Sequence, residues 1–433
     1  MRITSPSSSA TDAVVTYCTN SHAGESLPQI EAALCDVFGT VQQTLGSKSH
    51  GHLGENDGEP FALGLWLSDA TVEPLATNRR ELEALRATLK RLNLVVPSLN
   101  AFPFGNFHAD EVKFRVYEPG WWDPRRADYT LRCATVLAEL AAEMPEHWPS
   151  VPKSISTVGL GNRETTTEAH LADAREQLGR VAGELARIHE ETGIEIVLAL
   201  EPEPLTYLET TPESIRFFAE LFEDPVAVDA AGDHSYLPRY VGVCFDACHQ
   251  AVLWEDVAEA YRAYCEAGVR IGKVQVSCAV EREHTVDPHA ALARFAEPRF
   301  LHQVYARETD PDGALFGESD LPDALAKSEW MREFDWRCHF HVPIYLDELG
   351  GGLRSTQSSL KSLLAEVHRR ARGETSHDCE SERAPLLEIE TYTWSVLPPE
   401  LLPREDPRPG APAGLIREVQ WLQQTWETLG VAT

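Results

Sequence analysis

VGVCFDACHQAV, residues 241–252, is the stretch that most directly indicates how this chain folds. The apolar run from Val241 to Phe245 has the pattern of a buried strand, which Asp246 ends and His249 follows three residues later. A carboxylate at the tip of a buried strand is costly to bury unless a cation or hydrogen-bond donors compensate it. The stretch therefore predicts a metal site at a strand end, with a helix N-cap role for Asp246 as the alternative.

Strand-like runs alternate with amphipathic helix patterns along the whole chain. This alternation predicts a single α/β domain over residues 1–433, a (β/α)₈ TIM barrel, with a doubly wound open sheet as the alternative. Neither GxGxxG after the first strand nor GxxxxGK[ST] occurs, so nucleotide binding has no motif support. The expected barrel strands lie within residues 13–18, 61–68, 94–105, 154–161, 195–204, 241–245, 269–279 and 386–394.

Residues 280–337 interrupt this alternation after the seventh expected strand. They are rich in charge and proline, which predicts an inserted lid-like segment with short helices over the barrel mouth, or else a surface excursion without a role. Trp330, Phe334 and Trp336 are expected to pack over a substrate. The strand-like run 337–352 follows the insertion as an extra piece.

Composition limits the partners of this chain. The 433 residues carry a formal net charge of −30, which argues against nucleic acid and anionic membranes as partners. Nine cysteines without a CxxC pair, and no apolar run of about 18 residues, predict a cytoplasmic protein without direct membrane insertion. We expect a small-molecule metabolite as the partner, and a homodimer because barrels of this kind often pair near the mouth.

Polar side chains stand at the ends of several expected strands. In a barrel all strand tips face one end, so these residues should converge on a small volume. Acidic groups gathered without matching Lys or Arg would repel one another, and a divalent cation resolves the repulsion. Oxygen and imidazole ligands favour Mn²⁺ or Zn²⁺, with Mg²⁺ or Co²⁺ as alternatives. The predicted metal ligands are Glu201, Asp246, Gln275, His339, His341 and Glu390.

Each of these residues also has a purely structural interpretation. Glu201 could begin a loop in the EPEP segment, and His339 with His341 could form a polar patch under the insertion. Glu388 and Glu390 are expected to face opposite sides of the last strand, so that only one of them can be a ligand. Lys273 could bind a substrate anion or form a salt bridge to the carboxylates.

The pattern of these tips resembles a known superfamily. Glu201, Asp246-Ala-Cys-His249, Gln275 and Glu390 look like the xylose isomerase-like TIM barrels, which comprise sugar isomerases, ketose 3-epimerases and related metal-dependent endonucleases. Ketose epimerases usually carry His where this chain has Gln275. His339 and His341 resemble the extra ligands of the endonuclease branch, which binds more than one metal.

Segments spread over most of the chain also resemble the EboE family, called metabolite traffic protein EboE. This resemblance implies a place in a gene cluster that processes or moves a metabolite precursor beside a prenyltransferase-type membrane enzyme. The segments are YCTNSHAGES, SLNAFPFGNFH, WWDPRRADYT, SISTVGLG, FDACHQAV, KVQVS, HFHVPIYLDELGG with RSTQ, and LEIETYTW.

The sequence therefore favours a metal-dependent isomerase or epimerase of a small polyhydroxylated metabolite. Glu201 and Glu390 would act as base and acid on opposite faces of an enediolate, and His249 would hydrogen-bond a substrate oxygen or orient Asp246. A two-metal hydrolase of a small phosphorylated metabolite and a non-catalytic metabolite carrier are the alternatives. The residues predicted to contact the substrate are His22, Asn100, Lys273 and Trp394.

Overall fold

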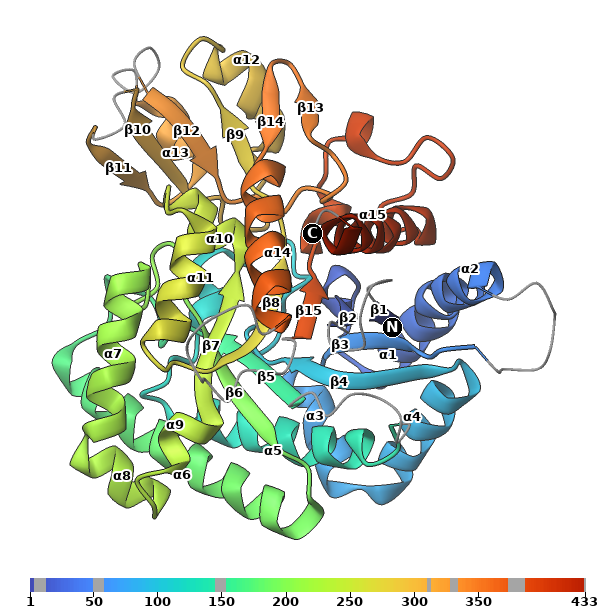
Figure 1. Cartoon of the computed structure of the whole chain (residues 1–433), viewed down its shortest axis with the longest axis vertical. Coiled ribbons are helices and arrows are strands. Elements are labelled where there is room, and N and C mark those ends of the chain that lie inside the picture. Colours follow the sequence, from blue (N-terminus) through green and yellow to red (C-terminus); the bar gives the residue numbers. More distant parts are fainter. Residues whose placement is uncertain are drawn as a thin grey trace.

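Eight parallel strands close into a barrel in the computed structural model, which describes residues 1–3, 13–49, 58–144, 153–309, 313–327, 334–372 and 386–431 (Figure 1). Strand β2 pairs with β15 on one side and with β3 on the other, which leaves the barrel without an open edge. The predicted (β/α)₈ barrel is confirmed, and the open-sheet alternative is wrong. The barrel strands are β2 (Ala13–Cys18), β3 (Phe61–Trp66), β4 (Leu94–Asn100), β5 (Lys153–Val158), β6 (Ile196–Glu201), β7 (Val241–Asp246), β8 (Ile271–Val276) and β15 (Leu386–Ile389), with β1 (Arg2–Ile3) antiparallel to β2.

Amphipathic helices surround the barrel because each buries one apolar face against the strands. In α4 (Arg79–Arg91), Leu82, Leu85 and Leu89 are buried at helical spacing. No described helix is both long and apolar enough to cross a membrane. The other helices are α1 (Leu27–Ala33), α2 (Gly39–Ser49), α3 (Asp69–Thr77), α5 (Pro124–Ala141), α6 (Glu168–Thr192), α7 (Thr211–Glu223), α8 (Pro225–Ala231), α9 (Tyr236–Tyr240), α10 (Ala247–Val252), α11 (Val257–Glu266), α14 (Gln357–Ala371) and α15 (Pro412–Val431).

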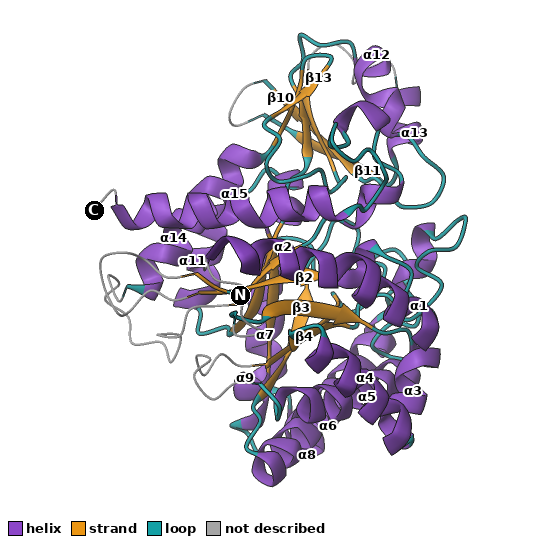
Figure 2. Cartoon of the chain, turned by 90° about the vertical axis from the view of Figure 1, so that its right-hand side faces the viewer, coloured by secondary structure: helices purple, strands orange, loops and turns teal. Residues whose placement is uncertain are grey.

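The inserted segment folds as an antiparallel sheet stacked on one end of the barrel, beside α15 (Figure 2). This sheet continues to Ser355, beyond the expected range 280–337. Its strands are only three to five residues long, which is too short for the sequence pattern to indicate them. Its strand order is β11-β10-β12-β9-β14-β13. The elements are β9 (Val280–Arg282), α12 (Pro288–Leu292), β10 (Val304–Glu308), β11 (Leu315–Glu318), α13 (Leu321–Ala326), β12 (Phe334–Cys338), β13 (Glu348–Gly350) and β14 (Leu353–Ser355).

The aromatic residues expected to cover a substrate have other positions in this sheet. Trp336 is fully buried, and the guanidinium carbon of Arg282 lies 5.3 Å from its ring centroid. Phe334 packs edge-on against Phe316 at a centroid distance of 5.4 Å. Trp330 lies outside the described residues. The role of the insertion as a lid stays a prediction, which the positions of Phe334 and Trp336 do not support.

A buried ion pair fills the barrel interior below the strand tips. Lys273 Nζ donates to Glu388 and lies 3.4 Å from Ser98 Oγ, while Thr16 Oγ1 donates to Glu388 Oε2 at 3.0 Å. Glu388 therefore points inward, as does Glu390 two residues later. Our expectation that they face opposite sides is wrong, because residues two apart on a strand share a face.

A second buried carboxylate joins α15 to the segments that carry the strand tips. Glu418 accepts hydrogen bonds from Tyr17 Oη at 2.5 Å, Thr391 Oγ1 at 2.7 Å and the backbone N–H of Ile344 at 3.1 Å. Burial raises the pKa of Glu418 to about 7. This carboxyl group thereby links the barrel, the segment after β15 and the inserted segment.

We expect Glu418→Gln to change how stability depends on pH. From the ordinary carboxyl value of 4.5 up to about 7, folded Glu418 holds a proton that the unfolded chain releases, so stability is lost as pH rises through this window. Glutamine does not titrate, so the variant does not lose stability in this way. Relative to the parent, its free energy of unfolding should rise by about 3 kcal/mol between about pH 4.5 and about pH 8. Urea unfolding across this range measures it. Glu427→Gln, at an exposed position of the same helix, is the control, and an equal response of both variants would contradict the prediction.

Candidate metal centre

Three carboxylates meet where β6, β7 and β15 end. Glu201 is the last residue of β6, Asp246 is the last residue of β7, and Glu390 directly follows β15. All three are buried, and one oxygen of each lies within 4.8 Å of the other two. The barrel thus brings together residues that are 189 positions apart in the sequence, as the strand-tip argument predicted.

One carboxylate oxygen of Asp246 accepts hydrogen bonds, and the other has no partner among the described residues. Its Oδ1 accepts from the backbone N–H of His249 at 2.9 Å, which caps α10, and from Ser277 Oγ at 2.9 Å. Its Oδ2 is buried and has no hydrogen-bond partner among the described residues. The cap interpretation of Asp246 is therefore correct for one oxygen and leaves the other available as a ligand.

Glu390 is held in place by three amide groups. Its Oε1 accepts from Asn20 Nδ2 at 2.7 Å and from Asn100 Nδ2 at 3.0 Å, and its Oε2 accepts from Gln275 Nε2. The amide oxygen of Gln275 in turn accepts from Cys244 Sγ at 3.1 Å. Gln275 thus has both ends of its amide engaged, and its geometry suits orienting Glu390 more than binding a metal directly.

His341 presents a ring nitrogen to the same carboxylates. Its Nδ1 lies 2.8 Å from the backbone oxygen of Glu390, which can only accept, so Nδ1 carries the proton and Nε2 has the lone pair. Nε2 is buried without a described partner and lies 4.0 Å from Asp246 Oδ2. Burial lowers the pKa of His341, which keeps the ring neutral and able to bind a metal.

The electrostatics of this cluster require a cation or protons. Burial, followed by the charges of Glu390 and Asp246, raises the pKa of Glu201 well above its ordinary value. Burial also raises the pKa of Glu390 to about 7. Glu201 Oε2, like the free atoms of Asp246 and His341, has no partner among the described residues. These three atoms have lone pairs that could bind a divalent cation, and the cation would also offset the repulsion between the carboxylates.

A second cluster lies beside the first and consists of Glu203, His249 and His339. His249 Nδ1 lies 3.0 Å from Pro202 O, and His339 Nδ1 lies 2.6 Å from Gln303 Oε1. Because both Nδ1 atoms donate to carbonyl oxygens, both Nε2 atoms carry lone pairs, and they face each other at 3.2 Å. Two facing lone pairs repel, and a cation or a shared proton relieves the repulsion.

Glu203 completes this second cluster. Its Oε1 accepts from Gln303 Nε2 at 2.9 Å and from Tyr117 Oη at 3.2 Å, and it lies 3.5 Å from His339 Nδ1. Burial raises the pKa of Glu203 to about 8. The Glu203 carboxyl group is thus surrounded by uncharged hydrogen-bond donors, and none of the contacts named here is with a cationic side chain.

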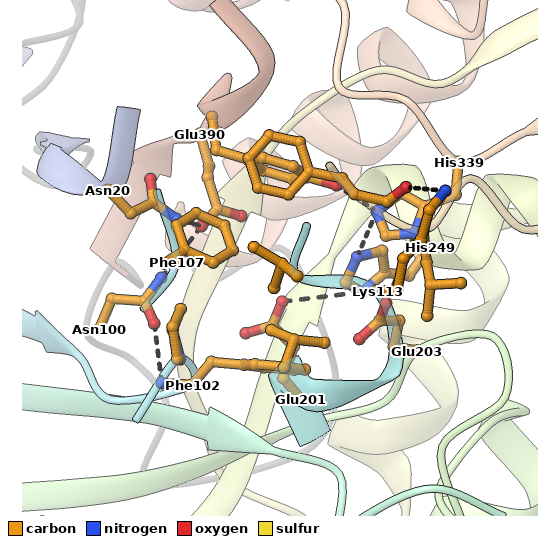
Figure 3. Close-up of a pocket in the computed structure, with 16 residues that line it drawn as sticks. Asn20, Asn100, Phe102, Phe107, Lys113, Glu201, Glu203, His249, His339 and Glu390 are labelled. Atoms are coloured by element: carbon orange, nitrogen blue, oxygen red, sulfur yellow. Dashed lines mark hydrogen bonds and ion pairs between the residues drawn. The ribbon is translucent and has the colours of Figure 1, made fainter. Parts of the chain in front are cut away.

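A pocket opens onto both clusters (Figure 3). Of the predicted site residues, Glu201, His249, His339, Glu390 and Asn100 line it, while Asp246, Gln275 and His341 are fully buried next to them. The polar residues that line the pocket are Asn20, Asn100, Lys113, Glu201, Glu203, His249, His339 and Glu390.

Three residues predicted to contact the substrate lie outside this pocket. His22 Nε2 donates to Gly410 O, 2.9 Å away, and His22 lines a smaller cavity beside α1. Lys273 is engaged with Glu388 inside the barrel. Trp394 is buried, and its Nε1 donates to Tyr17 Oη at 2.9 Å. Each is positioned by a protein partner; for Lys273 the alternative interpretation, a salt bridge to a carboxylate, is correct.

Other residues of the site were not predicted. Glu203 follows Glu201 by two positions, and Tyr392 follows Glu390 by two. Because residues two apart on a strand share a face, this spacing could have predicted that both line the same site. Gln303 and Tyr117 carried no signal, because one lies in the inserted sheet region and the other in the loop after β4. Only the folded chain brings them to Glu203.

No known family model matches this sequence, and no curated protein matches it. Among solved structures, the chain is similar to a xylose isomerase-like TIM barrel protein from Mycobacterium smegmatis in complex with magnesium, with 11% identity over 96% of this chain and 97% of that chain and a TM-score of 0.47. It is also similar to apo 3-keto-D-glucoside 4-epimerase, YcjR, from E. coli, with 13% identity over 95% and 99% of the chains and a TM-score of 0.43. The IOLI protein with a binding zinc atom has 13% identity over 97% of both chains and a TM-score of 0.38. These similarities assign no substrate or reaction to this chain.

Proposed function

We propose that this chain is a metal-dependent isomerase or epimerase of a small metabolite that carries adjacent carbonyl and hydroxyl groups. The observation that supports this most is the set of unpartnered buried atoms Glu201 Oε2, Asp246 Oδ2 and His341 Nε2 at the end of the pocket. With Glu390 they offer oxygen and imidazole donors that suit Mn²⁺ or Zn²⁺, with Mg²⁺ or Co²⁺ as alternatives. When bound, the cation would polarise the substrate oxygens and acidify the C–H bond between them.

The chain's own residues would move the proton. Glu201 lines the pocket, and because its Oε2 is assigned to the cation, we assign the role of the base to its other oxygen, Oε1, which lies 3.7 Å from His249 Nδ1. Glu390, fixed by three amide donors, would return the proton on the other face. His249 has its Nδ1 engaged with Pro202 O, so its Nε2 would accept a hydrogen bond from a substrate hydroxyl.

Two measurements test this proposal. Metal analysis of protein reconstituted with Mn²⁺ or Zn²⁺ should find bound metal, and incubation in D₂O with a panel of hydroxyketones and ketoses should place solvent deuterium at the carbon next to the carbonyl. Glu201→Gln should abolish the exchange, whereas Glu168→Gln, at an exposed position of α6, should not change it. Metal-loaded protein that binds panel members but never exchanges deuterium would favour a non-catalytic carrier instead.

A two-metal hydrolase of a small phosphorylated metabolite is the second candidate function. The facing Nε2 atoms of His249 and His339 beside Glu203 favour it, because they could hold a second cation next to the first. Two bound metals per chain, together with release of phosphate from phosphorylated hydroxyketones, would select this function over the isomerase.

We also propose membership of the EboE family, on the resemblance of the segments quoted above. The net charge of −30 and the nine cysteines support a cytoplasmic protein that acts on a small molecule. A homodimer stays part of this proposal, and sedimentation of the purified chain would test it. The inserted sheet, which supplies His339 and Gln303 to the site, would act as the lid.

A further inference from the structure

One part of the pocket wall is apolar and aromatic. Three rings pack against one another there: Phe107 and Phe300 at a centroid distance of 5.0 Å, Phe300 and Tyr392 at 4.9 Å, and Phe107 and Tyr392 at 5.6 Å. Val112 and Val116 also line the pocket. These rings and valines offer contact area to apolar groups, and the one polar side-chain atom among them, Tyr392 Oη, lies 3.4 Å from His339 Nε2.

The charged group on this side is already engaged. Lys113 Nζ donates to Phe300 O at 2.7 Å and to Asp320 Oδ2 at 2.5 Å, and lies 3.3 Å from Glu297 O. These contacts use all three ammonium protons. Among the described lining residues, the fully buried side-chain polar atoms without protein partners are Glu201 Oε2 and Asn20 Oδ1, and both residues neighbour Glu390.

The apolar wall forms where the barrel meets the insertion. The backbone N–H groups of Val112 and Lys113 donate to Arg299 O at 2.8 and 3.0 Å, which fixes the loop after β4 against the segment that carries Phe300. Phe107 and Phe300 are 5% and 3% exposed, so a group placed against them would be removed from water. Figure 3 shows Phe107 on the opposite side of the pocket from His249 and His339.

We propose that the substrate is amphipathic, with a hydroxycarbonyl end at the carboxylates and an aromatic or branched aliphatic group against Phe107, Phe300 and Tyr392. This inference rests on the proposed function, because the polar end is taken to bind at the metal centre. A fully hydroxylated sugar would leave hydroxyl groups unpaired at the apolar wall, which disfavours it by about 10- to 100-fold. The pocket thus narrows the substrate class from sugars to hydroxycarbonyl compounds with an apolar substituent.

Three hydroxamates test this directly, because each carries the same chelating group and a different substituent. Acetohydroxamate, benzohydroxamate and gluconohydroxamate would be titrated calorimetrically into Zn²⁺-loaded protein and into metal-free protein. We expect benzohydroxamate to bind at least about tenfold more tightly than the other two, which corresponds to the gain from burying an aromatic group.

Variants test whether the preference for benzohydroxamate comes from the apolar wall. Phe107→Ala should remove most of the advantage of benzohydroxamate, and Phe107→Leu, which keeps the wall filled, should keep part of it if the alanine variant folds poorly. Phe114→Ala is the matched control, because Phe114 belongs to the same loop but is 42% exposed and does not line the pocket.

The outcomes separate the two proposals. Gluconohydroxamate binding as tightly as benzohydroxamate, in a metal-dependent way, would overturn the amphipathic substrate and leave the metal centre intact. A preference for benzohydroxamate that needs no metal and disappears in Phe107→Ala would support the apolar subsite while contradicting the metal centre. Absence of binding by all three compounds would overturn both.

Discussion

Asp246→Asn should weaken binding of the divalent cation by at least about 100-fold while leaving the barrel folded. Replacing a group that only supports a metal ligand typically costs 10- to 100-fold in affinity, and Asp246 is a candidate ligand itself. The substitution removes one negative charge from the cluster that it forms with Glu201 and Glu390, and so weakens the attraction of that cluster for a cation.

The local structure should survive this change. The side-chain amide oxygen of the variant would still accept from the backbone N–H of His249 and from Ser277 Oγ, as Asp246 Oδ1 does. The α10 cap is therefore preserved, and circular dichroism should be unchanged. Competition with a metal chelator of known affinity gives the dissociation constant for Zn²⁺ or Mn²⁺.

Asp256→Asn provides a matched control for this experiment. Asp256 caps α11 by accepting from the backbone N–H groups of Ala258 and Glu259, but it lies outside both carboxylate clusters. Its substitution should leave metal affinity at the parent value. Equal metal affinity in Asp246→Asn and the parent would show that β7 does not end in a metal ligand.

Lys273→Met should cause the largest loss of stability, about 3–5 kcal/mol of unfolding free energy. Lys273 and Glu388 are both fully buried, and methionine would leave the Glu388 carboxylate inside the barrel without its cation. Burial lowers the pKa of Lys273, but the Glu388 charge and nearby groups outweigh it and keep the ammonium ionised. The Glu388 carboxylate occupies the space that a Cβ at residue 64 would fill, so it packs directly against the backbone of Gly64.

A double-mutant cycle separates the effect of the unpaired charge from the effect of altered packing. Replacing both partners, as Lys273→Met with Glu388→Leu, removes the unpaired charge and should recover most of the stability lost in the single variant. Urea unfolding measures all four proteins. Arg79→Met, which breaks an ion pair whose side chains are 85% and 56% exposed, should change stability by less than about 0.5 kcal/mol.

A double variant no more stable than Lys273→Met would contradict the charge explanation. The loss would then come from packing, because methionine and leucine would fail to fill the interior layer. Retained stability in Lys273→Met itself would contradict the predicted loss.

The sequence by itself determined the barrel and the strand ends that carry its chemistry. Alternation of apolar strands and amphipathic helices is a local property, and so is the position of Glu201, Asp246 and Glu390 at the ends of apolar runs. In a closed parallel barrel, strand ends must face one mouth, so their convergence followed from the fold class without knowledge of any contact.

Only the tertiary structure decided what each side chain contacts. Gln275 holds Glu390, and the inserted segment brings Gln303 to Glu203, neither of which the local pattern specified. For Lys273 the sequence left two roles open, and the structure shows the salt bridge, to Glu388. The pairing of the insertion's strands into a sheet was likewise not predictable from its sequence. These outcomes depend on strand register and on pairing between distant segments, and a one-residue change of register redirects every side chain of a strand. The sequence therefore determined which groups reach the mouth, while long-range pairing decided which of them remain free to bind.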